Sequence, residues 1–252
     1  MNKTRICVLV LVVALVALSV AAPIAGAGKR GNSQGVIPPN ATPGGMSYGD
    51  WGAAWWQWAM STPKADNPLA DPTGDMVGSG QSGHVWFLCG TITMTPTGPT
   101  TYVGYADREV TVPAGKMLFF PICNVEASTA EGNGTTYDEL AGVCDWYMSR
   151  TTPADVTVDG RHVKNLMKYR ATSGLYQLWW PVDNVIDLPP ISTTDPKATT
   201  TSVSDGYWIM LAPLSKGTHH LHWSGATVIS TANGDDFDAT WAQDITYTAH
   251  VK

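Results

Sequence analysis

Glu126 and Asp183 each adjoin an apolar segment that is expected to form a strand. Two carboxyl groups that face each other across a cleft are the arrangement that hydrolyses glycosidic bonds. The chain contains 21 acidic residues, so many such pairs are conceivable. The sequence does not show which two carboxyl groups lie close together in the fold. Glu126 and Asp183 are therefore the candidates for acid and base if the protein is an enzyme.

His220 and His222 lie two residues apart in an expected strand, so their side chains point to the same face of it. Two imidazoles on one face are suited to hold a single metal ion. A third ligand would have to come from His250 or from an acid elsewhere in the chain. The alternative is a polar face of an outer strand, on which neighbouring side chains satisfy the histidines.

Four residues of one Asp/Pro/Gly-rich loop, Asp66, Asn67, Asp71 and Asp75, carry the oxygen atoms that Ca²⁺ prefers as ligands. Their spacing does not match the EF-hand, and an Asp-Pro-Thr-Gly-Asp sequence also forms a turn capped by its own side chains. Calcium is the one cofactor that the sequence indicates, and the alternative is no cofactor.

The chain contains 11 tryptophans. Exposed indole rings stack on the apolar faces of sugars, whereas buried indoles fill cores. Three tryptophans in or beside expected strands are the candidates for a carbohydrate-binding surface, and the others are expected to be core. These candidates are Trp179, Trp180 and Trp208.

Three of the four cysteines follow the N-terminal segment, and none belongs to a Cys-x-x-Cys motif. An oxidising compartment permits one disulfide and leaves one thiol. Cys89 lies in an apolar run and is expected to be a small buried side chain. The predicted disulfide is Cys123–Cys144, which would stabilise the fold by about 3 kcal/mol.

The N-terminus has the pattern of a secretory signal, with a basic start, an apolar run and a small-x-small end. We expect cleavage after Ala27, so that residues 1–27 are removed. An uncleaved membrane anchor is the alternative, because the apolar run reaches the short limit for a bilayer span. Residues 28–45, rich in Gly, Pro, Asn and Ser, predict a flexible leader before a single domain at 46–252.

The formal net charge of −6 becomes more negative once the basic start is removed. An acidic balance argues against nucleic acid and against anionic membrane surfaces as partners. The expected location is outside the cytoplasm, secreted or at the cell surface, with no membrane contact after cleavage. Extracellular polysaccharide or cell-surface components are the expected partners.

Two capping boxes predict helices. Ser47 and Asp50 begin a tryptophan-rich helix that ends near Ser61, and Thr136 and Glu139 begin a second helix. Gly78, Gly80 and Gly83 match a dinucleotide-binding pattern, but no strand precedes them and no helix follows, which excludes that function. The expected strands are 84–91, 101–106, 108–112, 116–122, 156–158, 176–180, 207–211, 218–223 and 245–251.

Short strands with short turns and two helices indicate a mainly β protein. We predict a single antiparallel β-sandwich, jelly-roll-like, with the tryptophan-rich helix packed against it and the second helix inserted midway. Pro113-Ala114-Gly115 is expected to be a tight turn between two of the strands. About 200 ordered residues bury a core large enough to fold without metals.

Four motifs occur along the chain: Tyr48-Gly49-Asp50-Trp51, Val85-Trp86-Phe87-Leu88 with Gly90-Thr91, Val112-Pro113-Ala114-Gly115-Lys116 and Phe119-Phe120-Pro121. Together they resemble those of an uncharacterised family of exported prokaryotic proteins with a Trp-rich N-terminal helix and a β-sheet body. The resemblance extends from about Tyr48 to Val251 and implies export and a shared fold, with no activity attached.

These observations favour a non-enzymatic exported protein that binds polysaccharide or forms part of a surface structure. No nucleophile lies beside a base, and no closed set of metal ligands is evident. Two alternatives remain open. One is a secreted carbohydrate-active hydrolase, and the other is a self-assembling surface subunit whose leader adds a strand to a neighbour.

Overall fold

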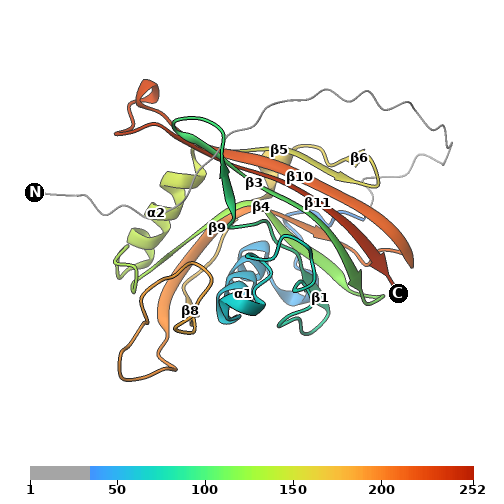
Figure 1. Cartoon of the computed structure of the whole chain (residues 1–252), viewed down its shortest axis with the longest axis horizontal. Helices are drawn as coiled ribbons and strands as arrows, with labels where there is room; N and C mark the ends of the chain where they lie inside the picture. Colours follow the sequence, from blue (N-terminus) through green and yellow to red (C-terminus); the bar gives the residue numbers. More distant parts are fainter. Residues whose placement is uncertain (1–34) are drawn as a thin grey trace, which may run out of the picture.

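The computed structural model describes residues 35–252, so the predicted signal peptide lies outside the described residues. Within them the fold is mainly β, with two α-helices (Figure 1). None of the helices in this part of the chain is long and apolar enough to cross a membrane. The elements are α1 (Tyr48–Ser61), β1 (Val85–Phe87), β2 (Met94–Pro96), β3 (Thr101–Val112), β4 (Met117–Ser128), α2 (Tyr137–Met148), β5 (Thr151–Val158), β6 (Arg161–His162), β7 (Arg170–Thr172), β8 (Tyr176–Leu178), β9 (Thr200–Leu211), β10 (Gly217–Ile229) and β11 (Ala239–Val251).

The strands form two open, mixed sheets. The first sheet has the order β1-β4-β9-β7, with β8 also paired to β9, and the second has the order β2-β3-β11-β10-β5-β6. The prediction of purely antiparallel pairing is wrong, because β1 runs parallel to β4 and β3 runs parallel to β11. Parallel neighbours need a long connection, and four strands of the first sheet (β4, β7, β8 and β9) lie in the chain between β3 and β11.

The turn at Pro113–Gly115 connects β3 to β4, as the sequence predicts, but it does not make a hairpin. β3 belongs to the second sheet and β4 to the first, so the turn carries the chain from one sheet to the other. Gly115 has φ of +84°, a conformation that side chains disfavour. The Ala114 amide donates to the Lys252 carbonyl at 2.7 Å, which ties this turn to the end of β11.

The two sheets pack face to face around a shared aromatic core. Phe120 of the first sheet stacks on Trp223 of the second at 4.4 Å, and Trp223 stacks in turn on Tyr247 at 5.3 Å. Side chains alternate along a strand, so Phe119 points to the opposite face and stacks on Trp208 at 5.2 Å. The first sheet is therefore buried on both of its faces.

Helix α1 covers the outer face of the first sheet (Figure 1). Its predicted capping box is present, with Ser47 and Asp50 each satisfying a backbone amide of the other. Trp55 is 1% exposed, packs against Trp208 at 5.8 Å and donates from its indole nitrogen to the Leu88 carbonyl at 2.9 Å. The predicted core role of the helix tryptophans is confirmed.

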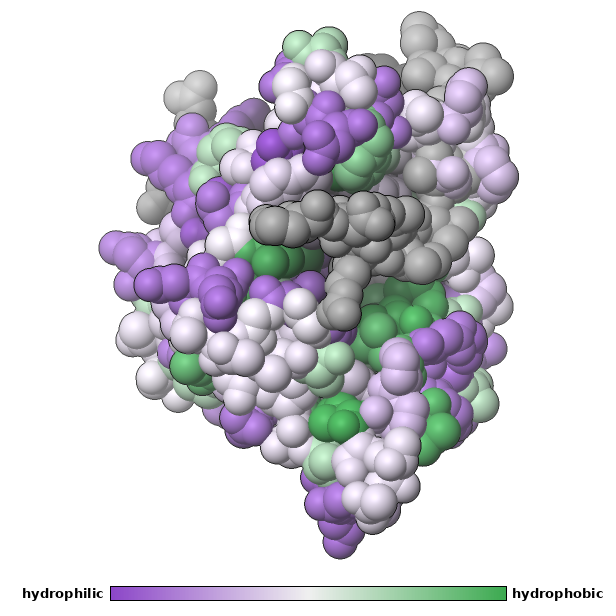
Figure 2. Space-filling model, turned by 90° about the vertical axis from the view of Figure 1, so that its left-hand side faces the viewer, coloured by the Kyte–Doolittle hydropathy of each residue, from purple (hydrophilic) through white to green (hydrophobic). Residues whose placement is uncertain are grey.

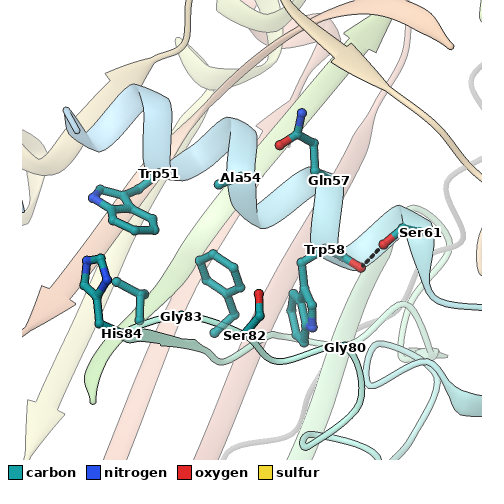
Figure 3. A pocket seen from close by; sticks show the side chains of 11 residues that line it. Trp51, Ala54, Gln57, Trp58, Ser61, Gly80, Ser82, Gly83 and His84 are labelled. Atoms are coloured by element: carbon teal, nitrogen blue, oxygen red, sulfur yellow. Dashed lines mark hydrogen bonds between the residues drawn. The ribbon is translucent and has the colours of Figure 1, made fainter. Parts of the chain in front are cut away.

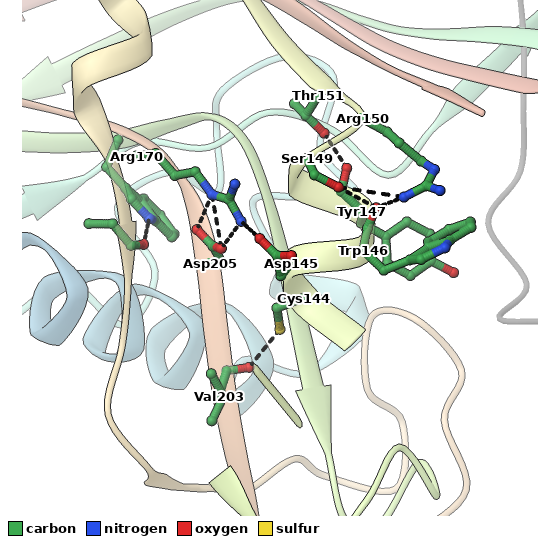
Figure 4. Close-up of polar contacts among 12 residues, drawn as sticks. Cys144, Asp145, Trp146, Tyr147, Ser149, Arg150, Thr151, Arg170, Val203 and Asp205 are labelled. Carbon is green, nitrogen blue, oxygen red and sulfur yellow. Dashed lines mark hydrogen bonds and ion pairs between the residues drawn. The ribbon is translucent and has the colours of Figure 1, made fainter. Parts of the chain in front are cut away.

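Helix α2 lies at one end of the molecule against β4 and β9 (Figure 1). Its capping box is also present, and hydrogen bonds from backbone amides and from Thr136 lower the pKa of Glu139 to about 2. Arg170 at the start of β7 fastens the helix to the sheet, pairing with Asp205 at 2.6 Å and with Asp145 at 2.7 Å (Figure 4).

The predicted disulfide is not formed. Cys123 lies in the core between the sheets. Cys144 lies on the buried face of α2, where its thiol donates to the Val203 carbonyl at 3.4 Å (Figure 4). The two thiols therefore belong to different hydrophobic clusters. Burial raises the pKa of the Cys123 thiol to about 12, which keeps it protonated and unreactive.

From Gly35 onward, the segment predicted to be a flexible leader is part of the folded unit. Val36 forms a β-bridge with Leu211, and the Ile37 amide donates to the Met210 carbonyl at 2.8 Å. The Tyr48 hydroxyl donates to the Ile37 carbonyl at 2.6 Å, so this segment and α1 hold each other in place. The remaining leader residues, 28–34, lie outside the described residues.

Arg108 of β3 is 1% exposed and forms no ion pair within residues 35–252. Its oxygen acceptors are one hydroxyl and four backbone carbonyls of the long segment between α1 and β2, and the Cys89 thiol lies beside it at 3.6 Å. The guanidinium lies 5.5 Å from the Tyr247 ring. Its partners, at 2.7 to 3.0 Å, are the carbonyls of Pro68, Asp71, Cys89 and Gly90 and the hydroxyl of Tyr247.

Two helical glycines give a matched test of how tightly α1 is packed. A Cβ at Gly49 would overlap the Thr172 carbonyl, whereas a Cβ at Gly142 in α2 would meet no atom within 4 Å. We expect Gly142→Ala to raise the free energy of unfolding by about 0.5–1 kcal/mol through helix propensity. Gly49→Ala should lower it by about 1–3 kcal/mol, because α1 must move off the sheet. Urea denaturation measures both, and a stabilising Gly49→Ala would contradict the close approach.

Candidate functional site

A groove of about 410 Å³ runs between α1 and the segment that leads into β1 (Figure 3). This volume is within the range of small-ligand sites. The α1 side supplies two tryptophans, and the facing segment supplies Phe87, His84 and a glycine-rich loop. The lining is Trp51, Ala54, Gln57, Trp58, Ser61, Gly80, Ser82, Gly83, His84, Val85 and Phe87.

The groove has a rigid aromatic floor. Trp58 and Phe87 pack at 5.5 Å, and the His84 ring meets Trp51 edge-on at 5.8 Å. Trp51, Trp58 and Phe87 are 7%, 6% and 9% exposed, so each of them presents only part of its ring to the groove. The floor therefore offers fixed apolar surface that needs no rearrangement before a ligand binds.

Both indole nitrogens of the floor already have partners. Trp51 donates to the Pro43 carbonyl at 2.9 Å, and Trp58 donates to the Ser79 carbonyl at 2.8 Å. These hydrogen bonds lock the rings and remove the donors that a ligand could use. What the tryptophans offer to a ligand is their carbon surface alone.

The polar groups of the groove lie at its rim. Ser61, Ser82 and His84 are exposed. In Figure 3 the Gln57 side chain points away from the groove, and its amide donates to the Gln177 carbonyl at 2.9 Å. The lining contains no Asp, Glu, Lys or Arg. The arrangement suits a neutral ligand that combines apolar faces with hydroxyl groups.

The loop opposite α1 takes its path from glycine. Gly80 and Gly83 have φ of +65° and +66°, which side-chain-bearing residues rarely adopt. A Cβ at Gly80 would also approach Trp58 Cδ1 at 3.2 Å. The glycines that match a dinucleotide pattern in the sequence therefore shape one wall of the groove.

Two of the three tryptophans predicted to bind carbohydrate are buried instead. Trp208 is 0% and Trp180 is 4% exposed, and both belong to the core under α1. Their ring faces are covered by protein, so the prediction of a binding surface on them is corrected. Trp179 is half-buried, and its indole nitrogen donates to the Pro196 carbonyl at 2.8 Å.

The loop predicted to bind calcium satisfies its own oxygen atoms. Asn67 is 1% exposed and bonds to the carbonyls of Ala59 and Thr62. The Asp71 carboxylate accepts hydrogen bonds from the backbone amides at 73, 74 and 76, while Asp66 and Asp75 point to solvent. The structure makes this segment a capped turn, which is the alternative that the sequence left open.

His220 and His222 lie on the outer face of the second sheet, where carboxylates or hydroxyls face them. His222 Nε2 is 2.8 Å from Asp244 and its Nδ1 is 4.0 Å from Asp155, while His220 is near Thr248. Among residues 35–252, no group of three or more His, Cys, Asp or Glu side chains is arranged to hold a metal ion. The predicted pair thus forms part of a polar sheet face.

Glu126 is not paired with Asp183. Asp183 is exposed in the loop after β8, where its carbonyl accepts a hydrogen bond from the Lys64 amide. Glu126 in β4 instead lies against Glu131, a neighbour that chain order alone did not single out. Burial and the Glu131 carboxylate raise the pKa of Glu126 well above its ordinary value.

Sequence reasoning assigned Trp51 and Trp58 to the core and overlooked His84, Phe87 and Ser82 as lining residues. The sequence feature that could have indicated the groove is the glycine-rich stretch at residues 78–83, because it directly precedes an aromatic strand. Comparison with family models finds no match, and neither curated proteins nor solved structures give one. No relative therefore indicates which ligand the groove binds, and its geometry is the guide to that ligand.

The His222–Asp244 pair predicts a measurable titration. The hydrogen bond that His222 donates to the Asp244 carboxylate raises the pKa of His222, so this pair stabilises the fold below the ordinary histidine pKa. That contribution is lost as the pH rises through the higher folded-state pKa. In Asp244→Asn, we expect the NMR titration midpoint of His222 to fall toward about 6.5.

The effect of this pair on the free energy of unfolding should stay within about 0.5 kcal/mol, because the pair is partly exposed to water. Asp236→Asn, which removes an exposed carboxylate from the loop before β11, is the control and should leave the midpoint unchanged. An unchanged midpoint in Asp244→Asn would refute the assigned cause.

Proposed function

We propose that this chain is an exported, non-enzymatic binding protein that holds carbohydrate in the groove between α1 and residues 80–87. One observation carries the proposal: an aromatic floor of Trp51, Trp58 and Phe87 lies under a rim of hydroxyl and imidazole groups. Sugar rings present apolar C–H faces ringed by hydroxyls, which is the chemical complement of such a site.

Binding without hydrolysis is favoured by where the acids lie. The groove lining contains no carboxylate, and the two candidates for acid and base occupy separate places in the fold. Hydrolysis needs two carboxyl groups on either side of the scissile bond. A carbohydrate in this groove would meet neither of them.

Strand donation by the leader is the other class of function that the sequence leaves open. Val36 and Ile37 already bond to the end of β9 of the same chain. Adding this segment to a neighbour would first require breaking those bonds. The bonds that this segment already makes favour a binding protein over an assembly subunit. The side of the molecule that carries α2 shows several hydrophobic areas among hydrophilic residues (Figure 2).

We further propose that the protein is secreted or held at the cell surface and belongs with the exported prokaryotic family that its motifs resemble. The basic, apolar and small-residue pattern of residues 1–27 supports export. The two face-to-face sheets support a β-sandwich as the description of the fold, although its mixed pairing departs from a jelly roll.

Carbohydrate binding in the groove is tested by ligand titration. Purified protein is titrated with a panel of polysaccharides and their fragments while tryptophan fluorescence and the melting temperature are followed. We expect a saturable spectral change and a higher melting temperature with at least one carbohydrate, because the folded state alone binds. Ser82→Phe places a ring in the groove and should weaken binding at least about tenfold, or about 1.4 kcal/mol.

Thr193→Phe is the matched control, because Thr193 is an exposed loop residue outside the groove and should bind as the wild type does. Trp179→Ala tests the surface that the sequence first indicated. Loss of binding in Trp179→Ala with normal binding in Ser82→Phe would move the site away from the groove. No response to any carbohydrate of the panel would reject the proposal.

A further inference from the structure

A second cluster of polar side chains lies at the end of β4, away from the groove. Glu126 is near the end of this strand, and Glu131 follows in the turn at residues 129–132. The two carboxyl groups are within hydrogen-bonding reach of each other. Ser202 donates to Glu126 at 2.6 Å, and Ser128 donates to Glu131 at 2.6 Å.

Strand register brings further hydroxyl groups to the same place. Ser204 lies opposite Glu126, while Ser202 lies opposite both Ser128 and Tyr176. Residues that face each other in antiparallel strands share one face of the sheet. The side chains from β4, β8 and β9 therefore converge on one face of the first sheet, around the two carboxyl groups.

Two of these hydroxyl groups are buried and have no well-aligned partner among the described residues. The Tyr176 and Ser204 hydroxyls lie close to each other, but neither forms a hydrogen bond of normal geometry, and Ser204 is 1% exposed. Buried polar atoms are nearly always hydrogen-bonded. Burial and the nearby Glu126 carboxylate raise the pKa of Tyr176.

Two adjacent carboxylates also need a compensating positive charge. Within residues 35–252, no Lys or Arg pairs with Glu126 or Glu131. A partly buried pair of like charges is costly, and either a proton or a metal ion between the oxygens relieves the repulsion.

We propose that Glu126, Glu131 and the hydroxyls around them bind a hard divalent cation, and Ca²⁺ in particular. All of the donors are oxygen atoms, which Ca²⁺ prefers. Glu131 lies in a turn, so its carboxylate can adjust to the irregular geometry that Ca²⁺ accepts and Mg²⁺ does not. Solvent molecules complete the coordination on the partly exposed side of Glu131.

The experiment uses purified protein freed of metal by chelation and titrated with Ca²⁺ or with Tb³⁺ as a luminescent substitute. We expect saturable Tb³⁺ emission sensitised by protein aromatic groups, displaced by Ca²⁺, and a melting temperature that Ca²⁺ raises. Glu131→Gln should weaken Ca²⁺ binding at least about tenfold, as the loss of one charged ligand does.

Glu126→Gln removes the other charged ligand and should fold without Ca²⁺ and bind it at least about tenfold more weakly. Tyr176→Phe, which removes only the hydroxyl, should weaken binding to a smaller extent. Glu109→Gln is the control, because Glu109 is an exposed carboxylate on the other sheet and should leave Ca²⁺ affinity unchanged. No saturable binding by the wild type, or equal binding by Glu131→Gln, would overturn the proposal.

Discussion

The buried guanidinium of Arg108 lies where the second sheet meets the long loop between α1 and β2, and the shape of that loop depends on it. Four backbone carbonyls and the Tyr247 hydroxyl surround it at 2.7 to 3.0 Å. A loop without regular structure has many carbonyls to satisfy, and five N–H donors in one fork satisfy several of them at once. Without Arg108, the Cys89 carbonyl would still accept from the Tyr247 hydroxyl and the Pro68 carbonyl from the Asp71 amide, but the Asp71 and Gly90 carbonyls would lose their partner, at a cost of about 1–3 kcal/mol for each one that stays buried.

This constraint determines where the groove can form. The residues that Arg108 holds at 68–71 and 89–90 flank the segment that provides one groove wall. The other wall is α1, which Trp55 joins to the same segment through the Leu88 carbonyl. Both walls are fixed to the β-sheets, so the aromatic floor is preorganised. A preorganised site loses less conformational entropy on binding than a flexible one. The Glu126–Glu131 cluster lies at the far end of β4 and is independent of this arrangement.

Local signals in the sequence predict both helices and most of the strands. The Ser47–Asp50 and Thr136–Glu139 capping boxes are visible as short motifs, and both are formed. The sequence near Pro113 does not indicate which strands pair with β3 and β4. β3 pairs with β11, more than a hundred positions away, whereas β4 pairs with β1 and β9 in the other sheet. The burial of Trp208 depends on the same kind of long-range packing, whereas the Glu126–Glu131 contact is local and depends on the turn that follows β4. Trp51 and Trp58 were predictable as core, but their partial exposure in a groove depends on the path of the facing loop.

Arg108 holds the segment at residues 66–91 in place and thereby preserves the groove. Hydrogen–deuterium exchange of the wild type and of Arg108→Lys measures this role, since lysine keeps the charge but cannot bridge the same carbonyls. Exchange at 66–91 should become faster in Arg108→Lys, while α2 at the far side of the first sheet should keep its wild-type rate and serve as the internal reference. If exchange at 66–91 stays at the wild-type rate, or increases only together with α2, Arg108 does not hold this segment.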